Sequence, residues 1–269
     1  MKKMTLKEIQ NVSLEILKDF HNFCVKNHLT YSLDSGTLIG AVRHRGFIPW
    51  DDDIDVIMPR QDYEILCESY KSEKGYKIIS NKSSFIFFAR ICEMDKTIVY
   101  SDFPWCKEKT GVWIDIFPID GAEDNESEFQ KRREKAKQLL QNQFRYRFAK
   151  NEFSFRKPIL YNLSILKRKL ELIIKNQSLE KLVEQQSILS QEVLFEKANF
   201  WSQFAFFTSY QYQLKSNFEY CVPIIFEKEQ FFVMNGYDEV LRNIYGNYME
   251  LPPVNERRPR HGKNHFFWK

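Results

Sequence analysis

The first part of the chain carries apolar residues at helical spacing. These residues, three or four positions apart, are Leu6, Ile9, Val12, Ile16, Phe20 and Phe23. This spacing places them on one face of a helix, which can then pack against a core. Thr5 and Glu8 form a capping-box pair at the start of the segment, since each side chain can bond the backbone amide of the other residue. We predict a helix over residues 5–27.

After this segment, short runs of β-branched and aromatic residues alternate with short helical patterns. An apolar stretch covers 29–33, and strands are predicted at 54–58, 77–79, 85–92, 97–100, 112–117 and 231–234. Further helices are predicted at 38–43, 63–70 and 238–245. Helices mixed with strands at unequal spacing are typical of an α/β or α+β domain.

The segment from about 125 to 200 differs, because its pattern is almost entirely helical and its one proline is Pro158. We therefore expect a mixed-sheet core over 1–124, a helical insertion or lobe over 125–225, and a C-terminal segment over 226–269 that returns to the core.

Composition narrows the class of protein. The 269 residues are 43% hydrophobic, which excludes a disordered chain, because such chains lack the apolar surface that offsets ordering entropy. The net charge of +4 is too small to indicate a nucleic-acid partner, and we expect none. No apolar run follows the charged start, and none approaches about 18 residues, so neither a signal peptide nor a membrane-spanning helix is expected.

The cysteines favour a reducing compartment. Their number is odd and none forms a C-x-x-C pair, the positions being Cys24, Cys67, Cys92, Cys106 and Cys221. This pattern indicates neither a disulfide framework nor a zinc finger. We expect a cytoplasmic protein, with the inner face of the cell membrane as a candidate place of action.

The helical segment contains a basic stretch and, after it, an amphipathic stripe. Lys131–Lys150 holds eight lysines and arginines against one acid, Glu134. This stretch is either a solvated helix face or a surface that meets anionic lipid headgroups. Beyond it, an amphipathic stripe beside Lys167–Lys169 consists of Ile159, Leu163, Leu166, Leu170 and Ile173.

The most informative motif is WDDDIDV at 50–56. Its four carboxylates repel one another, and folding them together is costly unless a cation neutralises them. In a strand, Asp53 and Asp55 would point the same way, roughly 6–7 Å apart, while Ile54 and Val56 face a core. Two convergent carboxylates are suited to a divalent cation such as Mg²⁺, whose oxygen ligands lie at about 2.0–2.1 Å.

Other interpretations of this motif compete. A solvated acidic loop is common, but this run lies between apolar residues and leads into a strand. An EF-hand loop needs Gly at position six and Glu at position twelve, where this chain has Val56 and Asp62. The D-x-D motif of a sugar-nucleotide glycosyltransferase uses the same metal and diphosphate chemistry, and it stays open.

Two further features point to the same chemistry. Ser35, Gly36 and Thr37 lie where a strand should meet a helix, so the free amides of the helix start could hold an anion, with Arg43 following. Asp115 is a lone carboxylate in an apolar strand, which is costly unless it is paired. It is either bonded to an arginine or a third carboxylate of the same metal site.

Three blocks of the sequence that contain these residues closely resemble the LicD family. The blocks are LDSGTLIGAVRH at 33–44 with GFIPWDDDID at 46–55 and MPR at 58–60, IDIFPID at 114–120, and YGNYMELPP at 245–253. The resemblance implies a nucleotidyltransferase-like fold, with a mixed sheet and flanking helices. It also implies metal-dependent transfer of a substituted phosphate from a CDP-activated donor to a glycan hydroxyl, with release of CMP.

The resemblance also bears on donor and acceptor. Family members commonly transfer phosphocholine from CDP-choline, and relatives of fukutin transfer ribitol phosphate. We therefore expect phosphocholine transfer to a cell-surface glycan such as teichoic acid, lipopolysaccharide or a capsule precursor, often lipid-linked. Transfer of glycerol or ribitol phosphate is the alternative, and a D-x-D glycosyltransferase is a more distant one. The intact carboxylates argue against a non-catalytic glycan-binding member.

Carried onto this chain, the resemblance assigns the site. Asp53 and Asp55 match the metal-binding acids, with Asp51 beside them and Asp115 as the third carboxylate, for Mg²⁺ or Mn²⁺. The turn at 35–37 matches the phosphate cradle, to which we add Arg43.

The sequence leaves two roles open, the proton acceptor and the choline cage, and each has several candidate residues. Candidate proton acceptors are Asp51 and, more weakly, His44 and His261. A choline ammonium could be caged by cation–π contact, for which the candidates are Tyr100, Trp105, Trp113 and the cluster at 201–212.

Overall fold

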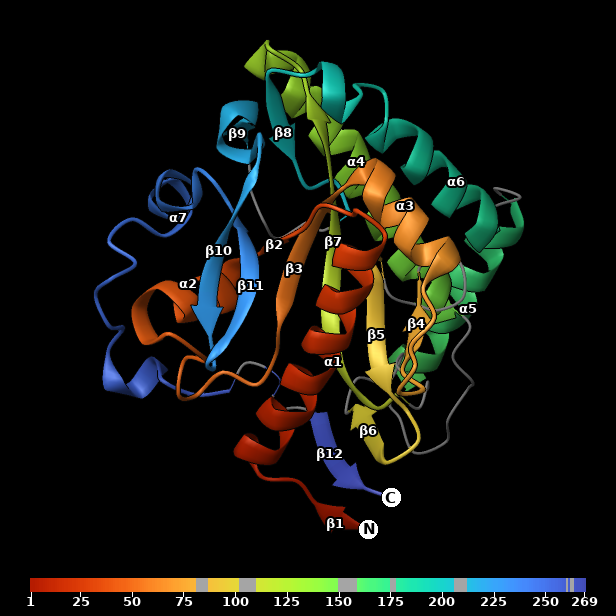
Figure 1. The fold of residues 1–269 in the computed structure, drawn as a ribbon. Helices are drawn as coiled ribbons and strands as arrows, with labels where there is room; N and C mark the ends of the chain where they lie inside the picture. Colours follow the sequence, from red (N-terminus) through yellow and green to blue (C-terminus); the bar gives the residue numbers. More distant parts are fainter. Residues whose placement is uncertain are drawn as a thin grey trace.

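A mixed sheet forms the centre of the molecule (Figure 1). The computed structural model describes residues 1–80, 87–101, 110–149, 159–174, 178–205, 212–259, 261 and 264–269. In this part of the chain the sheet has the strand order β2 (Ser32–Leu33), β3 (Asp55–Pro59), β7 (Val112–Ala122), β5 (Ala89–Glu93) and β4 (Lys77–Ile79). β3 runs parallel to β7, whereas the other neighbours in this order are antiparallel.

Three further groups of strands complete the β structure of the described residues. The far end of β7 pairs with β8 (Phe200–Ser202), which pairs with β9 (Gln213–Leu214). β10 (Cys221–Phe226) and β11 (Glu229–Met234) form a hairpin. β12 (Asn264–Trp268) lies between β1 (Lys2–Lys3) and β6 (Thr97–Ser101), so the two ends of the chain lie side by side.

Helices cover the sheet. The helices in the described residues are α1 (Leu6–Lys26), α2 (Ser35–His44), α3 (Arg60–Ser69), α4 (Glu126–Ala149), α5 (Ile159–Ile174), α6 (Leu179–Ser190) and α7 (Tyr237–Tyr245), with short 3₁₀ turns at Phe195–Lys197, Lys215–Phe218 and Val254–Glu256. In Figure 1, α1 crosses in front of β3, β7 and β5, and α4 runs behind β5 and α3. The predicted α/β fold, a mixed sheet with flanking helices, is confirmed.

α1 forms where the apolar spacing predicts it. The Thr5 side chain accepts a bond from the Glu8 amide, and the Glu8 side chain accepts one from the Thr5 amide, which completes the predicted capping box. Ile9, Ile16 and Phe20 are buried on one face of the helix. This cap satisfies amides that otherwise lack partners, and the buried face attaches α1 to the sheet.

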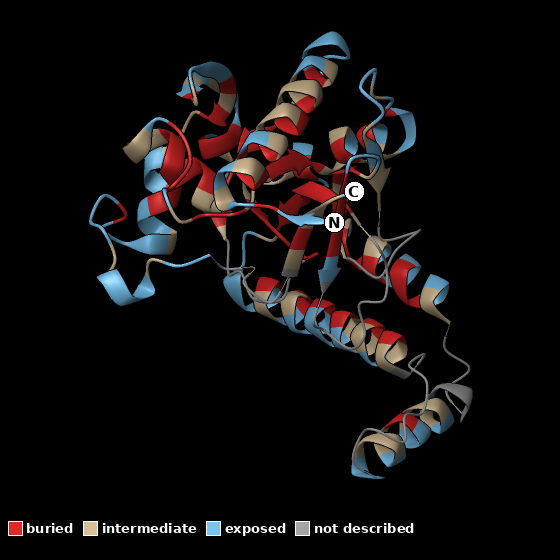
Figure 2. Cartoon of the chain, turned by 90° about the horizontal axis from the view of Figure 1, so that it is seen from below, coloured by how far each residue is buried: buried red, intermediate tan, exposed pale blue. Residues whose placement is uncertain are grey.

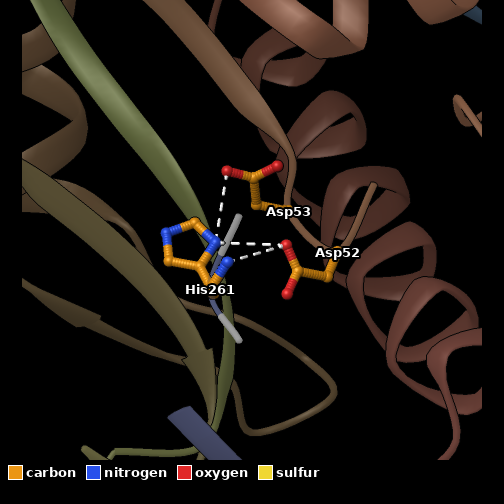
Figure 3. A group of neighbouring side chains, drawn as sticks. All are labelled: Asp52, Asp53 and His261. Atoms are coloured by element: carbon orange, nitrogen blue, oxygen red, sulfur yellow. Dashed lines mark hydrogen bonds and ion pairs between the residues drawn. The ribbon is translucent and has the colours of Figure 1, made fainter. Parts of the chain in front are cut away.

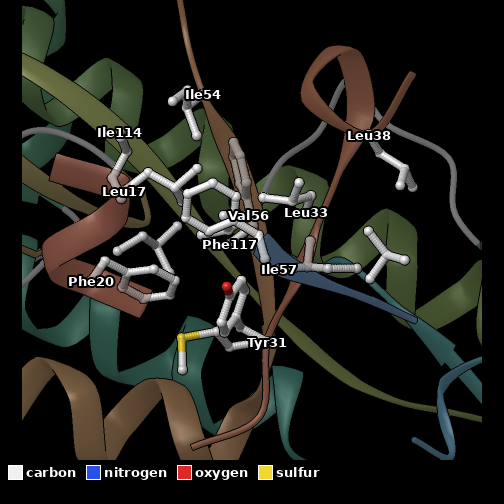
Figure 4. Packing of buried hydrophobic residues seen from close by; sticks show 14 of the residues in the cluster. Leu17, Phe20, Tyr31, Leu33, Leu38, Ile54, Val56, Ile57, Ile114 and Phe117 are labelled. Atoms are coloured by element: carbon white, nitrogen blue, oxygen red, sulfur yellow. The ribbon is translucent and has the colours of Figure 1, made fainter. Parts of the chain in front are cut away.

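β3 and β7 carry the core. Figure 4 shows Val56 and Ile57 of β3 and Phe117 of β7 packed with Leu17 and Phe20 of α1. All residues of β7 are buried, as expected for a strand of a sheet covered on both faces. Carboxylates therefore stand out in this pair of strands, because each needs a partner or a cation.

Most element boundaries fall close to the prediction. β7 continues five residues beyond the expected end at Phe117, to Ala122. Pro118 and Gly121 weaken strand propensity, but antiparallel pairing with β8 holds this end. α2 begins at Ser35, three residues earlier than expected, so the Ser-Gly-Thr sequence forms the first turn of the helix.

Some predictions concern longer-range organisation. The sequence pattern did not reveal β10 or β12, which pair with β11 and with β6. The predicted division into three parts at 124 and 225 stays a prediction. β8 and β9 lie inside the middle part, and β8 pairs with both β7 and β9. Residues 85–86 of one expected strand lie outside the described residues.

Arg60 and Asp120, both in motif blocks, form a buried ion pair far along the strands from Asp115. Arg60 Nε and Nη2 donate to Asp120 Oδ1 and Oδ2 over 2.7 and 2.8 Å. The Asp120 side chain is 1% exposed. The bidentate pair joins the start of α3 to β7, so these two motif residues have a structural role.

The basic stretch at 131–150 does not present all its charges on one surface. Arg132 is buried, donates to the carbonyl oxygen of Gly121 and lies over the ring of Phe204 at 4.2 Å. Arg147 is also buried. Lys131, Lys135, Lys137 and Arg145 are exposed, and Lys150 lies outside the described residues. Within the described part of the chain, every helix is too short or too polar to cross a bilayer.

Candidate active site

The parallel pairing of β3 and β7 brings two distant carboxylates together. Asp55 at the start of β3 is the register partner of Asp115 in β7. The Asp55 amide donates to Thr37 Oγ1 over 2.9 Å, and the Asp115 amide donates to the Ile54 carbonyl oxygen over 2.8 Å. Neighbouring strands lie about 4.8 Å apart, so side chains on the same face of these partners lie next to each other.

Asp53 completes a group of three carboxylates. One oxygen from each of Asp53, Asp55 and Asp115 lies within 4.8 Å of the others. Oxygens bound to one Mg²⁺ at about 2.0–2.1 Å are roughly 3–4 Å apart, so a small inward movement would let all three bind one ion. This arrangement of hard oxygen ligands fits a divalent cation such as Mg²⁺ or Mn²⁺.

The charges in this group destabilise one another. Burial raises the pKa of Asp55 well above its ordinary value, and the charges of Asp53 and Asp115 raise it further. Burial also raises the pKa of Asp53; His261 opposes this shift, while Asp115 adds to it. Among the described residues, no side chain donates a hydrogen bond to the Asp55 carboxylate. A bound cation would favour the charged forms of these groups, so the residues present fit the expected metal.

Asp115 differs from Asp55 because two side chains donate hydrogen bonds to it. Arg90 Nε donates to Asp115 Oδ1 over 2.6 Å, and Trp113 Nε1 donates to Oδ2 over 3.0 Å. The Arg90 guanidinium also lies over the Trp113 ring at 4.4 Å. Asp115 is therefore bonded to an arginine, as one interpretation from the sequence predicts, and it also faces the other two carboxylates. Its role as a third metal ligand stays a prediction.

His261 approaches the acidic motif from the C-terminal segment (Figure 3). Its Nδ1 lies 3.3 Å from Asp52 Oδ1 and 3.5 Å from Asp53 Oδ2. Burial by itself lowers the pKa of His261, but the hydrogen bond with Asp52 and the charges of Asp53 and Asp115 outweigh it and raise the pKa to about 8. Without a bound cation, the imidazole therefore carries a positive charge at neutral pH.

The first turn of α2 lies against the acidic motif. Asp34, the N-cap residue, is buried and accepts hydrogen bonds from the side chains of Ser35 and Gln203. Ser35 has a positive φ of 50°. A Cβ at Gly36 would lie 2.6 Å from Asp51 Oδ2, so the Asp51 side chain would have to move to admit one. The Asp51 backbone is held by Gln10, whose Nε2 donates to its carbonyl oxygen over 2.8 Å.

We expect Gly36→Ala to lower turnover by about 10²-fold, because a displaced reacting group can cost this much. The folded state should be nearly as stable as wild type, since the methyl group meets only the end of the Asp51 side chain. Gly111→Ala is the contrasting variant, because its Cβ would lie 1.6 Å from the Glu93 backbone oxygen. It should lower the thermal unfolding midpoint. Wild-type turnover in Gly36→Ala would contradict the close packing of α2 against Asp51.

The other predicted basic residues lie on the C-terminal side of α2. Arg43 Nη1 donates to the carbonyl oxygens of Tyr248 and Glu250 over 2.6 and 3.0 Å. It therefore ties α2 to the third motif block. Arg43 Nε donates to Nε2 of His44 over 3.0 Å, and the His44 ring packs edge-on against Trp50. Arg43 thus contacts His44 and the 245–253 block, whereas His44 contacts Arg43 and Trp50.

The aromatic residues suggested for a choline cage have other contacts. Arg90 lies over the Trp113 ring, and Phe266 stacks on it at 5.6 Å between centroids. Trp201 is fully buried, and Tyr100 packs edge-on against Phe267 on the small sheet at the chain ends. Trp105 and residues 206–211 lie outside the described residues.

Three site residues were missed from the sequence. Asp52 was part of the acidic motif, but its bond with His261 joins residues 209 positions apart. Arg90 and Gln10 contact Asp115 and Asp51 from other elements. A basic residue within a strand that is otherwise largely apolar, ARICE, is the one sequence signal that could have indicated Arg90, because such a charge needs a partner.

Comparison with known proteins identifies the family of this chain. The family model described as LicD/FKTN/FKRP, nucleotidyltransferase domain, matches residues 28–164. A lipopolysaccharide cholinephosphotransferase LicD of Haemophilus influenzae is 32% identical over 274 residues, which cover 97% of this chain and 97% of that protein. An uncharacterised protein of Rickettsia typhi is 33% identical over 133 residues, 47% of this chain and 40% of its own length. Because one relative aligns over nearly the whole chain and the family model contains the three-carboxylate group, the chain belongs to the LicD family.

Proposed function

We propose that this chain transfers phosphocholine from CDP-choline to a hydroxyl of a cell-surface glycan or its lipid-linked precursor, and releases CMP. The observation that carries the proposal is the group formed by Asp53, Asp55 and Asp115, which brings carboxylates from two separate motif blocks within 4.8 Å. The name of the Haemophilus influenzae relative, aligned over 97% of this chain, supports choline phosphate as the transferred group.

In the proposed reaction, the acceptor hydroxyl oxygen attacks the phosphorus distal to the nucleoside. The bond from that phosphorus to the oxygen of the CMP phosphate breaks, and CMP leaves with the electron pair. Such transfers depend mainly on positioning and on neutralising charge. Asp53, Asp55 and Asp115 would hold a divalent cation, which when bound would neutralise negative charge on the donor diphosphate.

The remaining residues of the site have separate roles. The amides at the start of α2, around Gly36 and Thr37, would bind phosphate oxygens, as the free amides of a helix start favour anions. Asp51, to which we assign no metal, is our candidate acceptor for the hydroxyl proton. His261 contacts Asp52 and Asp53 and would help to position this part of the acidic motif. Arg43 would position α2 through its bonds to 248 and 250 rather than bind phosphate itself.

The test is product analysis with the purified chain. CDP-choline, CDP-glycerol and CDP-ribitol are each supplied with lipopolysaccharide or a teichoic acid precursor, in the presence of Mg²⁺ or Mn²⁺ or with a chelator. We expect acceptor-dependent release of CMP from CDP-choline, which the chelator abolishes and added metal restores.

The other outcomes identify other enzymes. Release of CMP from CDP-ribitol or CDP-glycerol but not from CDP-choline would replace phosphocholine by an alditol phosphate. Release of a nucleoside diphosphate from a sugar nucleotide would indicate a glycosyltransferase. CMP release that is indifferent to the chelator would contradict the metal assignment.

A further inference from the structure

α5 exposes a row of large apolar side chains. Between 45% and 78% of each of these residues is exposed, and they are Ile159, Leu160, Leu163, Leu166 and Leu170. At roughly 100° per residue, Ile159, Leu163, Leu166 and Leu170 fall within one narrow stripe, which we call the α5 stripe. Solvent-exposed apolar rows of this kind usually mark a contact surface.

The opposite face of α5 attaches the helix to α4. Ile165 is fully buried, and the Tyr161 ring packs edge-on against Phe148 of α4 with centroids 5.7 Å apart. The Arg168 guanidinium lies over the same Phe148 ring at 4.6 Å. Tyr161 and Arg168 lie roughly 170° around the helix from the centre of the stripe, and Ile165 lies roughly 130° from it. α5 therefore has one face that packs within the chain and a second apolar face that points away from it.

The position of α5 in the fold leaves the stripe accessible. Figure 1 places the helix at the edge of the molecule, beside the lower part of α4. In Figure 2 it is the helix at the lower edge, apart from the sheet, with exposed and intermediate residues over most of its surface.

Basic residues flank the α5 stripe on both sides. Lys167 and Lys169 lie roughly 70–90° from its centre in opposite directions. The helix has one acidic residue, Glu171, against Lys167, Arg168 and Lys169. An apolar stripe with basic flanks is complementary to a surface that is apolar at depth and anionic at its boundary.

We infer that the α5 stripe docks this chain on a membrane surface rich in anionic lipid. The leucines enter the boundary between headgroups and acyl chains, and the flanking lysines contact lipid phosphates while their stems lie along the apolar layer. A second copy of the chain fits less well, because a symmetric pair through this stripe would bring the basic flanks together. The contact thus centres on α5 rather than on the basic stretch at 131–150. This goes beyond the proposed reaction and is independent of its donor.

Flotation with vesicles tests the inference on the full chain. The wild type should float with phosphatidylcholine vesicles that contain phosphatidylglycerol. Leu163→Ser combined with Leu166→Ser should lower the vesicle partition coefficient roughly tenfold or more, because two large side chains no longer leave water. Val25→Ser, at an exposed valine of α1, is the matched control and should bind as wild type. Equal thermal unfolding midpoints will show that the variants are folded.

The charge contribution has its own variant. Lys167→Gln combined with Lys169→Gln should weaken binding to the anionic vesicles several-fold and reduce its dependence on salt, since exposed charges are screened. Wild-type chain that stays unbound at low salt, or binding unchanged by the leucine substitutions, would overturn the inference. The inference would also be wrong if the wild type sediments as a dimer without lipid and the leucine substitutions dissociate this dimer. The stripe would then be the contact surface for a second copy of the chain.

Discussion

Asp55→Asn should abolish phosphate transfer and leave the metal-free fold at least as stable as wild type. Turnover should fall by about 10³-fold or more, because one charged ligand of the proposed cation is lost. The pKa of Asp55 is raised by burial and by Asp53 and Asp115, so its ionised form opposes folding at neutral pH. The substitution should therefore raise unfolding stability at pH 7, by an amount that fades as the pH falls toward about 4. CMP release and denaturant unfolding in chelator measure the two effects.

Asp115→Asn is the matched comparison, because it removes a carboxylate from the same group. It should also abolish transfer, but it leaves Arg90 without its carboxylate partner. Loss of one partner of a largely buried pair costs about 3 kcal/mol, so this variant should be clearly less stable than Asp55→Asn. Equal stability of the two variants would contradict the inference that the ion pair with Arg90 stabilises Asp115, whereas Asp55 has no such pair among the described residues. Wild-type turnover in Asp55→Asn would contradict the metal assignment.

Asp120→Ala should destabilise the fold by about 3–5 kcal/mol, because it leaves the Arg60 guanidinium buried without its charge partner. Arg60 Nε and Nη2 both lose their acceptors in this variant. Glu64, 3.2 Å from Arg60 Nη1, remains as a carboxylate partner, but it is partly exposed to solvent. Chemical denaturation measures the loss. Activity per folded molecule should remain near wild type, since Asp120 is not in the three-carboxylate group.

The control for this variant is an exposed pair. Glu134→Ala removes the partner of Lys137, with both side chains about half exposed, and such pairs contribute about 0–1 kcal/mol. A double variant, Arg60→Leu with Asp120→Leu, should recover much of the stability lost in Asp120→Ala, because no unpaired charge remains. If Asp120→Ala lowers the free energy of unfolding no more than Glu134→Ala does, the inference that Arg60 is a buried charge dependent on Asp120 is wrong.

Local features of the fold followed from the sequence. Apolar spacing and a capping box fixed α1, and alternation around the acidic motif placed β3, because these patterns act over a few residues. The motif also indicated convergent carboxylates at Asp53 and Asp55, since side chains two apart in a strand share a face. The same local argument indicated that Asp115, a lone carboxylate in an apolar strand, needs a partner.

The sequence by itself thus determined most of the elements and indicated the type of chemistry, but it did not reveal β10 or β12 and left open the contacts between distant segments. Only the tertiary structure decided that β3 and β7 are parallel with Asp55 opposite Asp115, that Arg90 fixes Asp115, and that His261 reaches Asp52. It also decided which face of α5 packs on α4 and which stays exposed. Pairing between segments depends on how the whole core packs, and the spacing of residues within one segment carries no information about its partner.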